Sequence, residues 1–331
     1  MNHQSLDLLS PDPVLEASLA AGLAQVEQEL RESVRSSSPF INEAAGYLVE
    51  AGGKRFRPLL VLLAAQFGDP SRPEVIRSAA AVELTHLATL YHDDVMDEAP
   101  MRRGASSANA RWGNSVAILT GDFLFARTSA ILADLGPEAV RIQARTFERL
   151  CIGQILETVG PEDGADPVKH HLEVLADKTG SLIAASGRYG ALMSGADSAT
   201  IEVLARFGEC IGVAFQLADD LVDIMSESSQ SGKTPGTDLR EGVPTLAALI
   251  ALGGQSVQDG RLRELLSRPL GDDDEHAEAL RLLRSHPALA EARQEACRWA
   301  DDARAALAPL PSGSAQQTLE LLCDYVVSRT G

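Results

Sequence analysis

Aromatic residues are scarce in this chain of 331 residues: eight Phe, four Tyr and two Trp account for only 4% of it. Hydrophobic residues nevertheless reach 45%. The apolar content is therefore mainly Ala, Leu, Val and Ile, which suits helices packed closely on helices. Because charged residues make up only 23%, disorder is excluded over most of the chain.

Basic residues are also few. The chain has 29 Lys and Arg against 47 Asp and Glu, which gives a formal net charge of −18 at pH 7. A protein this acidic is poorly suited to gripping nucleic acid through its phosphates or to docking on anionic lipid. We therefore expect no nucleic-acid partner.

Long apolar runs, basic leader segments and paired cysteines are lacking as well. The longest purely apolar stretches, such as Leu59–Ala65, fall short of the roughly 20 residues that span a bilayer. No Lys or Arg precedes Arg31, unlike in a signal or transit peptide. The cysteines form no CxxC pair, so no disulfide framework or zinc site is indicated. These absences predict a cytoplasmic protein without stable membrane insertion.

Helical periodicity covers almost the whole chain, and no stretch alternates apolar and polar residues for long enough to predict a strand. The pattern predicts an all-α single domain, residues 1–331, whose N-terminal helix at 13–36 is peripheral. Further helices are predicted over 39–50, 58–68, 73–98, 114–135, 137–160, 166–195, 199–226, 243–253, 258–268, 272–286, 289–308 and 313–329. The polar segment Ser226–Gly236 is predicted to be a mobile loop.

Two acidic clusters end long apolar helical runs, one in HDDVMDE and one in LADDLVD. Their carboxylates are Asp93, Asp94 and Asp97, and Asp219, Asp220 and Asp223. The first and third acids of each cluster are four residues apart and share a helix face, where like charges repel. Acids late in a helix also oppose its dipole. Since neither placement helps folding, the pattern indicates paired oxygen ligands for Mg²⁺.

A solvated acidic face is the alternative for either cluster in so acidic a chain. A third cluster, Asp272–Glu278, is a useful contrast because it opens a helix, where acids cap the backbone and complement the dipole. We assign it a structural role. The first two clusters have no such structural reason, and their matching form favours function.

Basic residues gather at a few turns. They are Lys54, Arg55 and Arg57 in GGKRFRP, Arg102 and Arg103 in PMRRG, Lys178 in DKTG, and Lys233 in SGKTPG. Arg offers a planar fork to phosphate oxygens and Lys a point charge. A ligand with several phosphates would account for these residues and the acidic clusters together. No P-loop or GxGxxG pattern is present, so a nucleotide is not indicated.

The motifs GGKRFRP, HDDVMDEAPMRRG, GQILE, DKTG and FQLADDLVD, in this order, resemble those of the trans-polyprenyl diphosphate synthase family. The resemblance extends from about Asn42 to the C-terminus. It implies an all-helical domain around a central cavity, usually as a homodimer. It also implies a reaction that joins isopentenyl diphosphate head to tail to an allylic diphosphate such as farnesyl or geranylgeranyl diphosphate.

The resemblance carries roles to individual residues. The implied catalytic set is Asp93, Asp94, Asp97, Asp219, Lys178, Thr179 and Gln216. The implied metal ligands are Asp93, Asp97, Asp219, Asp220 and Asp223, for three Mg²⁺ ions that Mn²⁺ can replace. Arg102, Lys178 and Lys233 would hold the allylic diphosphate. Lys54, Arg57, His86 and Arg103 would hold isopentenyl diphosphate, with Thr179 and Gln216 facing the reacting carbon.

Product length is read from the helix that precedes Asp93. In the family a bulky aromatic four or five residues before this aspartate stops chain growth, whereas this chain has Thr89 and Ala88, followed further back by Thr85. On the next long helix, Ser129 also leaves room. We therefore expect a long product, heptaprenyl or beyond.

Three alternatives remain besides a purely structural helical protein: a short-chain synthase, a class I terpene cyclase, and a non-catalytic subunit of a heteromeric synthase. A cyclase has no second substrate and no use for GGKRFRP, while non-catalytic subunits typically lack an Asp cluster that this chain keeps. One departure from the family is Val243, where many relatives carry Lys. This places more of the diphosphate binding on Lys233.

Overall fold

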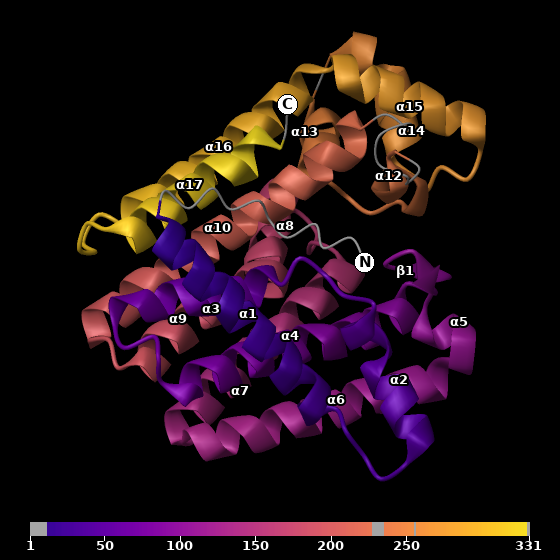
Figure 1. Ribbon diagram of the computed structural model, residues 1–331. Coiled ribbons are helices and arrows are strands. Elements are labelled where there is room, and N and C mark those ends of the chain that lie inside the picture. The colour runs from indigo at the N-terminus through magenta and orange to yellow at the C-terminus, as the bar shows by residue number, and fades with distance from the viewer. Residues whose placement is uncertain (1–11, 227–234, 255, 330–331) are drawn as a thin grey trace. The chain divides into compact units, whose positions relative to one another are not determined.

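The computed structural model describes residues 12–226, 235–254 and 256–329 (Figure 1). Most of these residues lie in helices, which confirms the all-α prediction. The helices are α1 (Pro13–Ser33), α2 (Pro39–Glu50), α3 (Phe56–Ala64), η1 (Ala65–Phe67), α4 (Pro73–Met96), α5 (Ala108–Trp112), α6 (Asn114–Leu135), α7 (Pro137–Val159), α8 (Pro167–Leu175), η2 (Ala176–Gly180), α9 (Ser181–Ser194), α10 (Ser198–Met225), α12 (Thr237–Glu241), α13 (Leu246–Gly253), η3 (Val257–Asp259), α14 (Gly260–Leu266), α15 (Asp273–Ser285), α16 (Pro287–Ala306) and α17 (Ser314–Ser328).

Local signals explain where many of these helices begin. Proline is the first residue of α1, α2, α4, α7, α8 and α16, a position whose backbone N–H would have no helical partner anyway. Asp12, Ser38 and Asp166 each accept a backbone hydrogen bond as the N-cap of the helix that follows. Asp272 caps α15 through the N–H groups of Asp274 and Glu275. The structural role predicted for the third acidic cluster is therefore confirmed.

The chain divides into two compact units. Unit 1 contains the described residues up to Phe147, together with Leu182–Arg206 and Pro309–Leu319. Unit 2 contains Glu148–Ser181, Phe207–Ala308 and the described residues from Glu320 onward. Because α7, α10 and α17 each contribute to both units, neither unit is a continuous segment of the sequence. The single domain over the whole chain stays a prediction.

The core of unit 1 surrounds α4, which packs against α6, α3 and α1. Tyr91 is fully buried, and its hydroxyl donates to the carbonyl of Ala44 at 2.6 Å and accepts from the N–H of Leu48 at 3.3 Å. Gly190 of α9 permits close packing on α3, since a Cβ there would lie 2.2 Å from the carbonyl oxygen of Val61. A helix buried on nearly every side explains the apolar run before the first acidic cluster.

The core of unit 2 is formed by the second half of α10 with α13, α15 and α16. α16 contributes the small buried residues Ala288, Ala292 and Ala296, spaced four apart on one face. These small side chains let α13 approach α16 closely, and both helices belong to the core that buries the apolar face of α10. The second acidic cluster lies on this supported part of α10.

α6 meets the length and composition criteria for a membrane span, and it is the one described helix that does. It packs along α4, and 39% of its most apolar window is buried inside the structure. A single helix of this kind is weak grounds for a membrane span, because core helices of globular proteins have the same length and composition. The absence of stable membrane insertion stays a prediction.

Short elements differ from the sequence-based expectation. A hairpin of β1 (Met101–Arg102) and β2 (Ala105–Ser106) lies where a loop was expected, and its turn residues Arg103 and Gly104 have φ values of 53° and 79°. Two positive φ values are what a tight two-residue hairpin turn requires. Strands of two residues have no detectable period. The predicted helix over 166–195 is also interrupted by a π-helical turn, η2.

Candidate active site

The first acidic cluster lies at the C-terminal end of α4 in unit 1. Asp94 is fully buried, and its Oδ1 accepts from Nε of Arg102 in β1 at 2.6 Å. Burial raises the pKa of Asp94 although Arg102 opposes the shift. Asp97 is exposed and Asp93 half-buried. The three acids are therefore not equivalent: Asp94 anchors the hairpin, while Asp93 and Asp97 lie nearer the surface of the unit.

His86, on the same helix, lies near enough to several arginines for their charges to act on it. Burial lowers the pKa of His86 well below its usual value of 6.5, and the positive charges of Arg57, Arg103, Arg55 and Arg102 add to this effect. Burial also lowers the pKa of Arg57, whose Nε is buried and has no hydrogen-bond partner among the described residues. A neutral imidazole among several guanidinium groups is a strong electrostatic site for a polyanion.

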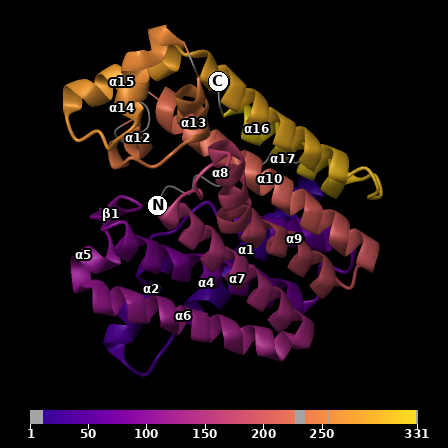
Figure 2. The same cartoon turned by 180° about the vertical axis from the view of Figure 1, so that it is seen from behind.

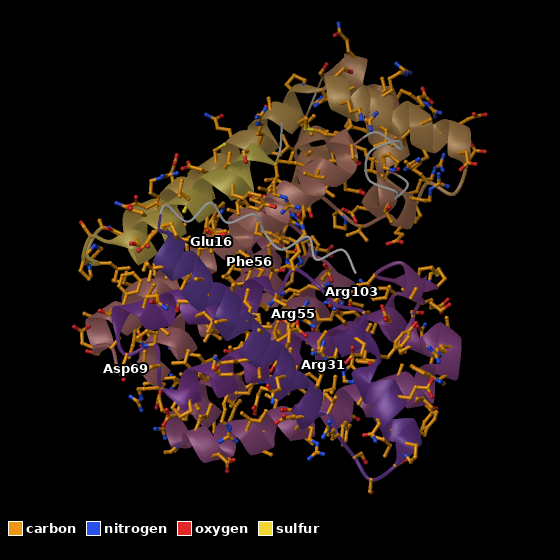
Figure 3. All side chains as sticks on the ribbon, viewed as in Figure 1. Glu16, Arg31, Arg55, Phe56, Asp69 and Arg103 are labelled. Carbon is orange, nitrogen blue, oxygen red and sulfur yellow. The ribbon has the colours of Figure 1, made fainter. Side chains whose placement is uncertain are left out.

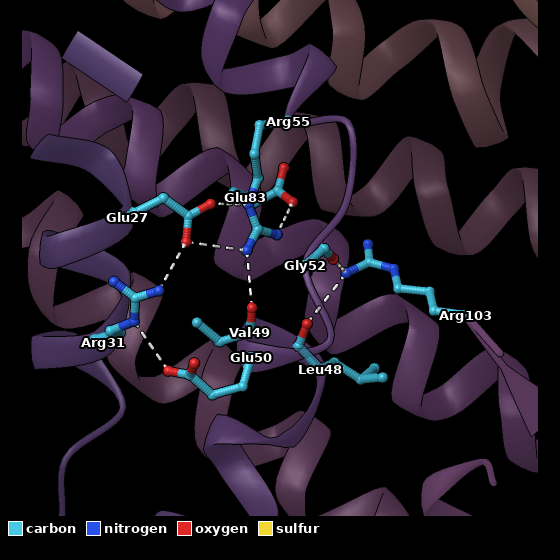
Figure 4. Close-up of polar contacts among 9 residues, drawn as sticks. All are labelled: Glu27, Arg31, Leu48, Val49, Glu50, Gly52, Arg55, Glu83 and Arg103. Atoms are coloured by element: carbon cyan, nitrogen blue, oxygen red, sulfur yellow. Dashed lines mark hydrogen bonds and ion pairs between the residues drawn. The ribbon is translucent and has the colours of Figure 1, made fainter. Parts of the chain in front are cut away.

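Arg55 differs from its sequence neighbours Lys54 and Arg57, because its guanidinium is held by groups of the protein itself. Its guanidinium donates to Glu27 of α1, Glu83 of α4 and the carbonyl of Val49 (Figure 4). Lys54 is exposed. The motif GGKRFRP therefore contains one arginine that faces the protein core, between basic residues on either side.

Arg103 has both a structural and a predicted binding role. Its Nη1 donates to the carbonyl of Leu48 at 3.1 Å and to the carbonyl of Gly52. Figure 3 labels Arg31, Arg55 and Arg103, which come from α1, from the loop before α3 and from the hairpin turn. The hairpin and the GGKRFRP loop are thus joined through Arg103.

The second acidic cluster lies on α10 in unit 2. The side chain of Asp220 is 12% exposed, against 40% for Asp219, and its Oδ1 accepts from Nε2 of Gln216 at 3.0 Å. Burial raises the pKa of Asp220 to about 7, assisted by the charge of Asp238 and opposed by Gln216. Asp219 forms an ion pair of 2.6 Å with Arg329.

The remaining acid of this cluster, Asp223, binds the segment before α12. Its carbonyl accepts from the N–H of Gly236 at 2.9 Å, and its Oδ2 accepts from the N–H of Asp238 at 3.3 Å. Asp223 therefore ties the C-terminal end of α10 to the start of α12. Lys233, which was predicted to contact the allylic diphosphate, lies outside the described residues.

Lys178 and Thr179 lie in the π-helical turn η2, also in unit 2. Lys178 pairs with Glu157 of α7, and Thr179 Oγ1 donates to Oε1 of Gln216 at 3.3 Å. Gly153 of the GQILE motif allows α7 to lie directly against this turn, because a Cβ there would be 2.7 Å from the backbone nitrogen of Lys178. Single π-helical turns are frequent at functional sites. The predicted trio of Lys178, Thr179 and Gln216 is thus brought together.

A groove of about 420 Å³ lies in unit 1 beside α6 and the first half of α7, which run side by side (Figure 2). Three aromatic rings line this groove next to one another. The centroid of the Phe125 ring lies 5.7 Å from that of His92 and 4.5 Å from that of Phe147. Ser129 and Gln143 also line it. The sequence prediction considered positions on α4 and Ser129 on α6, and it missed these aromatics, of which Phe125 lies on α6 and Phe147 on α7.

The predicted length-determining residues lie on the face of α4 nearest this groove. Gln143 Nε2 donates to Oγ1 of Thr85 at 3.0 Å, and Thr85 in turn donates to the carbonyl of Ala81. Ala88 is fully buried, and its carbonyl lies close to Gly121 of α6. Thr89 is half-buried. The groove extends from His92, next to Asp93, at least to Gln143 at the level of Thr85, about 10 Å along the helix.

The sequence model of the polyprenyl synthetase family matches residues 38–283, about three-quarters of the chain and all five motifs. The chain belongs to the polyprenyl synthetase family. Its activity is therefore that of a prenyl diphosphate synthase, which is a transferase.

Individual relatives agree over nearly the full length of the synthase. It is 50% identical over 321 residues to nonaprenyl diphosphate synthase from Mycobacterium tuberculosis, covering 97% of this chain and 96% of that protein. The crystal structure of geranylgeranyl pyrophosphate synthase from Corynebacterium glutamicum, complexed with calcium and isoprenyl diphosphate, matches with a TM-score of 0.88 and 44% identity, covering 97% and 98% of the two chains. A decaprenyl diphosphate synthase structure from Rhodobacter capsulatus matches with a TM-score of 0.87 and 35% identity, covering 96% and 98%.

The carboxylates of the synthase fit a metal ion that takes some of its ligands from the protein and the others from a bound substrate. Over residues 12–226, 235–254 and 256–329, no three His, Cys, Asp or Glu side chains form a cluster able to hold a metal ion alone. Mg²⁺ usually takes one or two carboxylates and completes its octahedron with water and phosphate oxygens. Asp93 with Asp97, and the cluster on α10, supply donor sets of this kind.

Proposed function

We propose that the synthase condenses isopentenyl diphosphate head to tail with an allylic diphosphate, in a Mg²⁺-dependent reaction, and that the product is a long-chain all-trans polyprenyl diphosphate. The observation that carries this proposal is the arginine group around neutral His86 in unit 1. A terpene cyclase binds one diphosphate and has no need of this additional anion site. The same site, together with both acidic clusters, argues against a non-catalytic subunit.

The two diphosphates have separate binding groups in this proposal. Isopentenyl diphosphate binds Lys54, Arg57, His86 and Arg103, all in unit 1. The allylic diphosphate binds Arg102 and Lys178, with Lys233 as a further contact. Both diphosphates are multiply charged, and Arg and Lys are the side chains that bind phosphate oxygens most strongly.

The metal ligands are Asp93 and Asp97 on α4, and Asp219, Asp220 and Asp223 on α10. Mg²⁺ bound there would neutralise the negative charge that develops on the departing diphosphate. The buried carboxylate of Asp94 accepts a hydrogen bond from Arg102 and so holds this arginine in place. Asp219 also has a basic partner within the protein, since it forms an ion pair with Arg329.

The other parts of the site orient and protect the reacting carbons. The hydroxyl of Thr179 and the amide of Gln216 are hydrogen-bonded to each other and present oxygens toward the electron-poor allylic carbon. The groove beside α6 and α7 provides apolar and aromatic surface that excludes water, which would otherwise quench an allylic cation. The released diphosphate is itself basic enough to take up the final proton, so no side-chain base is needed for this step.

Two classes of product length are to be compared, a long chain of heptaprenyl or more and a shorter chain. The 50% identity with a nonaprenyl synthase, together with the small residues Ala88, Thr89 and Thr85, favours heptaprenyl or longer. The rings of Phe125 and Phe147 narrow the groove, and this observation, with the 44% identity to a geranylgeranyl synthase, favours a shorter product. We rank the long product first because the rings lie to the side of α4 and do not replace Ala88.

One incubation tests both the activity and the length. The protein is mixed with Mg²⁺, isopentenyl diphosphate and labelled farnesyl diphosphate, and the products are separated by chain length on reversed-phase chromatography. We expect products of seven or more isoprene units, and none when Mg²⁺ is chelated. Products that end at geranylgeranyl diphosphate would establish the short-chain alternative, and conversion without isopentenyl diphosphate would indicate a cyclase.

The assembly and location proposed with this function are a homodimer in the cytoplasm. They follow from the family resemblance and from the acidic composition of the chain. Sedimentation of the purified protein tests the dimer directly.

A further inference from the structure

Two arginines lie behind the two proposed anion sites rather than in them. Arg55 belongs to unit 1 and Arg149 to unit 2. Each guanidinium bonds to two carboxylates from different segments and to one backbone carbonyl. Both guanidiniums are therefore occupied by the protein itself.

Arg55 connects the GGKRFRP loop to three helices of unit 1 (Figure 4). Its Nε and Nη2 donate to the two carboxylate oxygens of Glu27 at 2.5 and 3.3 Å, and its Nη1 donates to Glu83 at 2.8 Å. Its Nη2 also donates to the carbonyl of Val49 at 2.9 Å. The side chains of Arg55 and Glu83 are only 6% and 3% exposed. Burial alone would lower the pKa of Arg55, but the hydrogen bonds and charges of Glu27 and Glu83 raise it, so the ion pairs are firmly held.

The position of Arg55 decides where its neighbours lie. Its backbone has φ 49° and ψ 36°, the left-handed conformation that non-glycine residues rarely adopt. Such a conformation persists only where surrounding contacts hold it. Since Lys54 precedes Arg55 and Arg57 follows two residues later, the buried ion pairs fix the direction in which both basic side chains leave the loop.

Arg149 has the corresponding position in unit 2. From α7 its Nε donates to Asp177 at 2.6 Å, and its Nη2 donates to Glu209 of α10 at 2.9 Å and to the carbonyl of Ala176 at 3.3 Å. Ala176 and Asp177 are the first residues of the π-helical turn, and Lys178 and Thr179 follow directly. Arg149 therefore fixes the π-helical turn between α7 and α10. It does so through Ala176 and Asp177, which directly precede Lys178 and Thr179, the residues proposed to bind substrate.

We propose that Arg55 and Arg149 are positioning residues, one for each diphosphate: Arg55 aligns the isopentenyl diphosphate group, and Arg149 aligns the allylic group. This inference rests on the proposed function, because it uses the assignment of Lys54 to isopentenyl diphosphate and of Lys178 to the allylic substrate. Binding groups are held accurately only when a second set of contacts fixes them. A displacement of about 1 Å at such a group can reduce activity by up to ~10²-fold.

The test exchanges the two arginines for lysine and compares both substrates. Lysine keeps the positive charge but cannot bond to two carboxylates and a carbonyl in the planar geometry of Arg. We expect Arg55→Lys to raise the KM for isopentenyl diphosphate by roughly tenfold while the KM for farnesyl diphosphate stays within about twofold. Arg149→Lys should do the reverse, so that each variant is the matched control for the other.

Lys54→Ala and Lys178→Ala are measured in parallel to separate the inference from the proposed function. If these variants show the expected substrate selectivity and the two arginine variants do not, the positioning roles are wrong. If Lys54→Ala leaves the KM for isopentenyl diphosphate unchanged, the division of the substrates is itself wrong.

Calorimetry distinguishes positioning from a merely structural contribution. A lower melting temperature with both KM values unchanged, or with both raised equally, would overturn the proposal. Should Arg55→Lys fail to fold, Glu27→Gln removes one partner from a less buried position, its side chain being 21% exposed. The same selective rise in the KM for isopentenyl diphosphate is then expected, and its absence would count against Arg55.

Discussion

At the scale of single residues, neighbours in one motif have opposite surroundings. Asp94 is fully buried against Arg102, whereas Asp97, three residues later, is exposed. Arg55 is buried, while Lys54 beside it is exposed. We therefore expect the exposed members of a charged motif to bind the substrate and the buried members to hold the motif in place, and substitutions should separate these roles.

Asp93→Ala and Asp219→Ala should each lower turnover by about 10²-fold or more, because the charge on the departing diphosphate would lose its stabilisation. Circular dichroism should show an unchanged helical fold. Asp274→Ala is the matched control: Asp274 belongs to the third acidic cluster, in the first turn of α15, and its loss should leave turnover unaltered. Near-normal turnover of either site variant at saturating Mg²⁺ would refute the metal assignment.

His171 should make stability depend on pH. Burial lowers its pKa from 6.5 to about 4, so the unfolded chain binds a proton at this histidine between pH 6.5 and about 4 while the folded chain does not. Stability is then lost as pH falls through this window, by on the order of 3 kcal/mol in total. Denaturant unfolding of wild type and His171→Gln from pH 7 to pH 4.5 measures the effect. The variant should lose less stability on acidification, and parallel curves would contradict the prediction.

At the scale of elements, glycines mark where helices meet most closely. Gly153 lets α7 touch the π-helical turn, and Gly190 lets α9 touch α3. These contacts support the two segments that we propose to bind substrate, because α3 begins in the GGKRFRP motif and the π-helical turn carries Lys178. A change in helix packing at either glycine is therefore expected to shift the neighbouring segment of the proposed site.

Gly190→Ala should destabilise the protein by at least about 1–3 kcal/mol, because its Cβ would lie 2.2 Å from the carbonyl oxygen of Val61 and the backbone would have to move. The gain in helix propensity, about 1 kcal/mol, cannot offset this. Gly46→Ala is the control, since nothing lies within 4 Å of a Cβ there; it should stabilise α2 by about 0.5–1 kcal/mol. Thermal unfolding of both variants checks whether Gly190→Ala lowers and Gly46→Ala raises the stability. A stabilised Gly190→Ala variant would disprove the close contact between α9 and α3.

At the scale of the whole molecule, product length depends on space that several helices share. The groove in unit 1 is lined by residues of α4, α6 and α7. Ala88, which the sequence singled out, is fully buried, so Ala88→Phe combines any shortening of the product with an overpacking cost of about 1–3 kcal/mol. A position that lines the groove and is exposed gives a cleaner test.

Ser129→Phe should shift the products toward shorter chains while the first condensation continues, because a third phenyl ring would fill the groove beside Phe125 and Phe147. Ser129→Ala is the control and should leave the distribution unaltered. Chromatography of the labelled products gives the readout. An unchanged distribution for Ser129→Phe would show that the growing chain does not occupy this groove.

Much about this protein follows from its sequence alone. Helical periodicity, prolines at helix starts and acidic N-caps are local signals, so the long helices were predicted to within a few residues, and the motif order was enough to indicate the family. Asp93 with Asp97, and Asp219 with Asp223, could be predicted as metal ligands from the sequence, because the charges of each pair repel each other and oppose the helix dipole.

Other features were decided only by tertiary structure, because they depend on partners distant in sequence. Nothing near Arg55 indicates that its guanidinium turns inward to Glu27 and Glu83, each 28 residues away. The contact of Gln143 with Thr85 spans 58 residues, and Arg149 reaches Glu209 across 60. Periodicity and charge spacing specify which face of a helix is apolar or charged. Which charges meet across helices is specified by packing, since an ion pair forms only where the fold brings both groups out of water together.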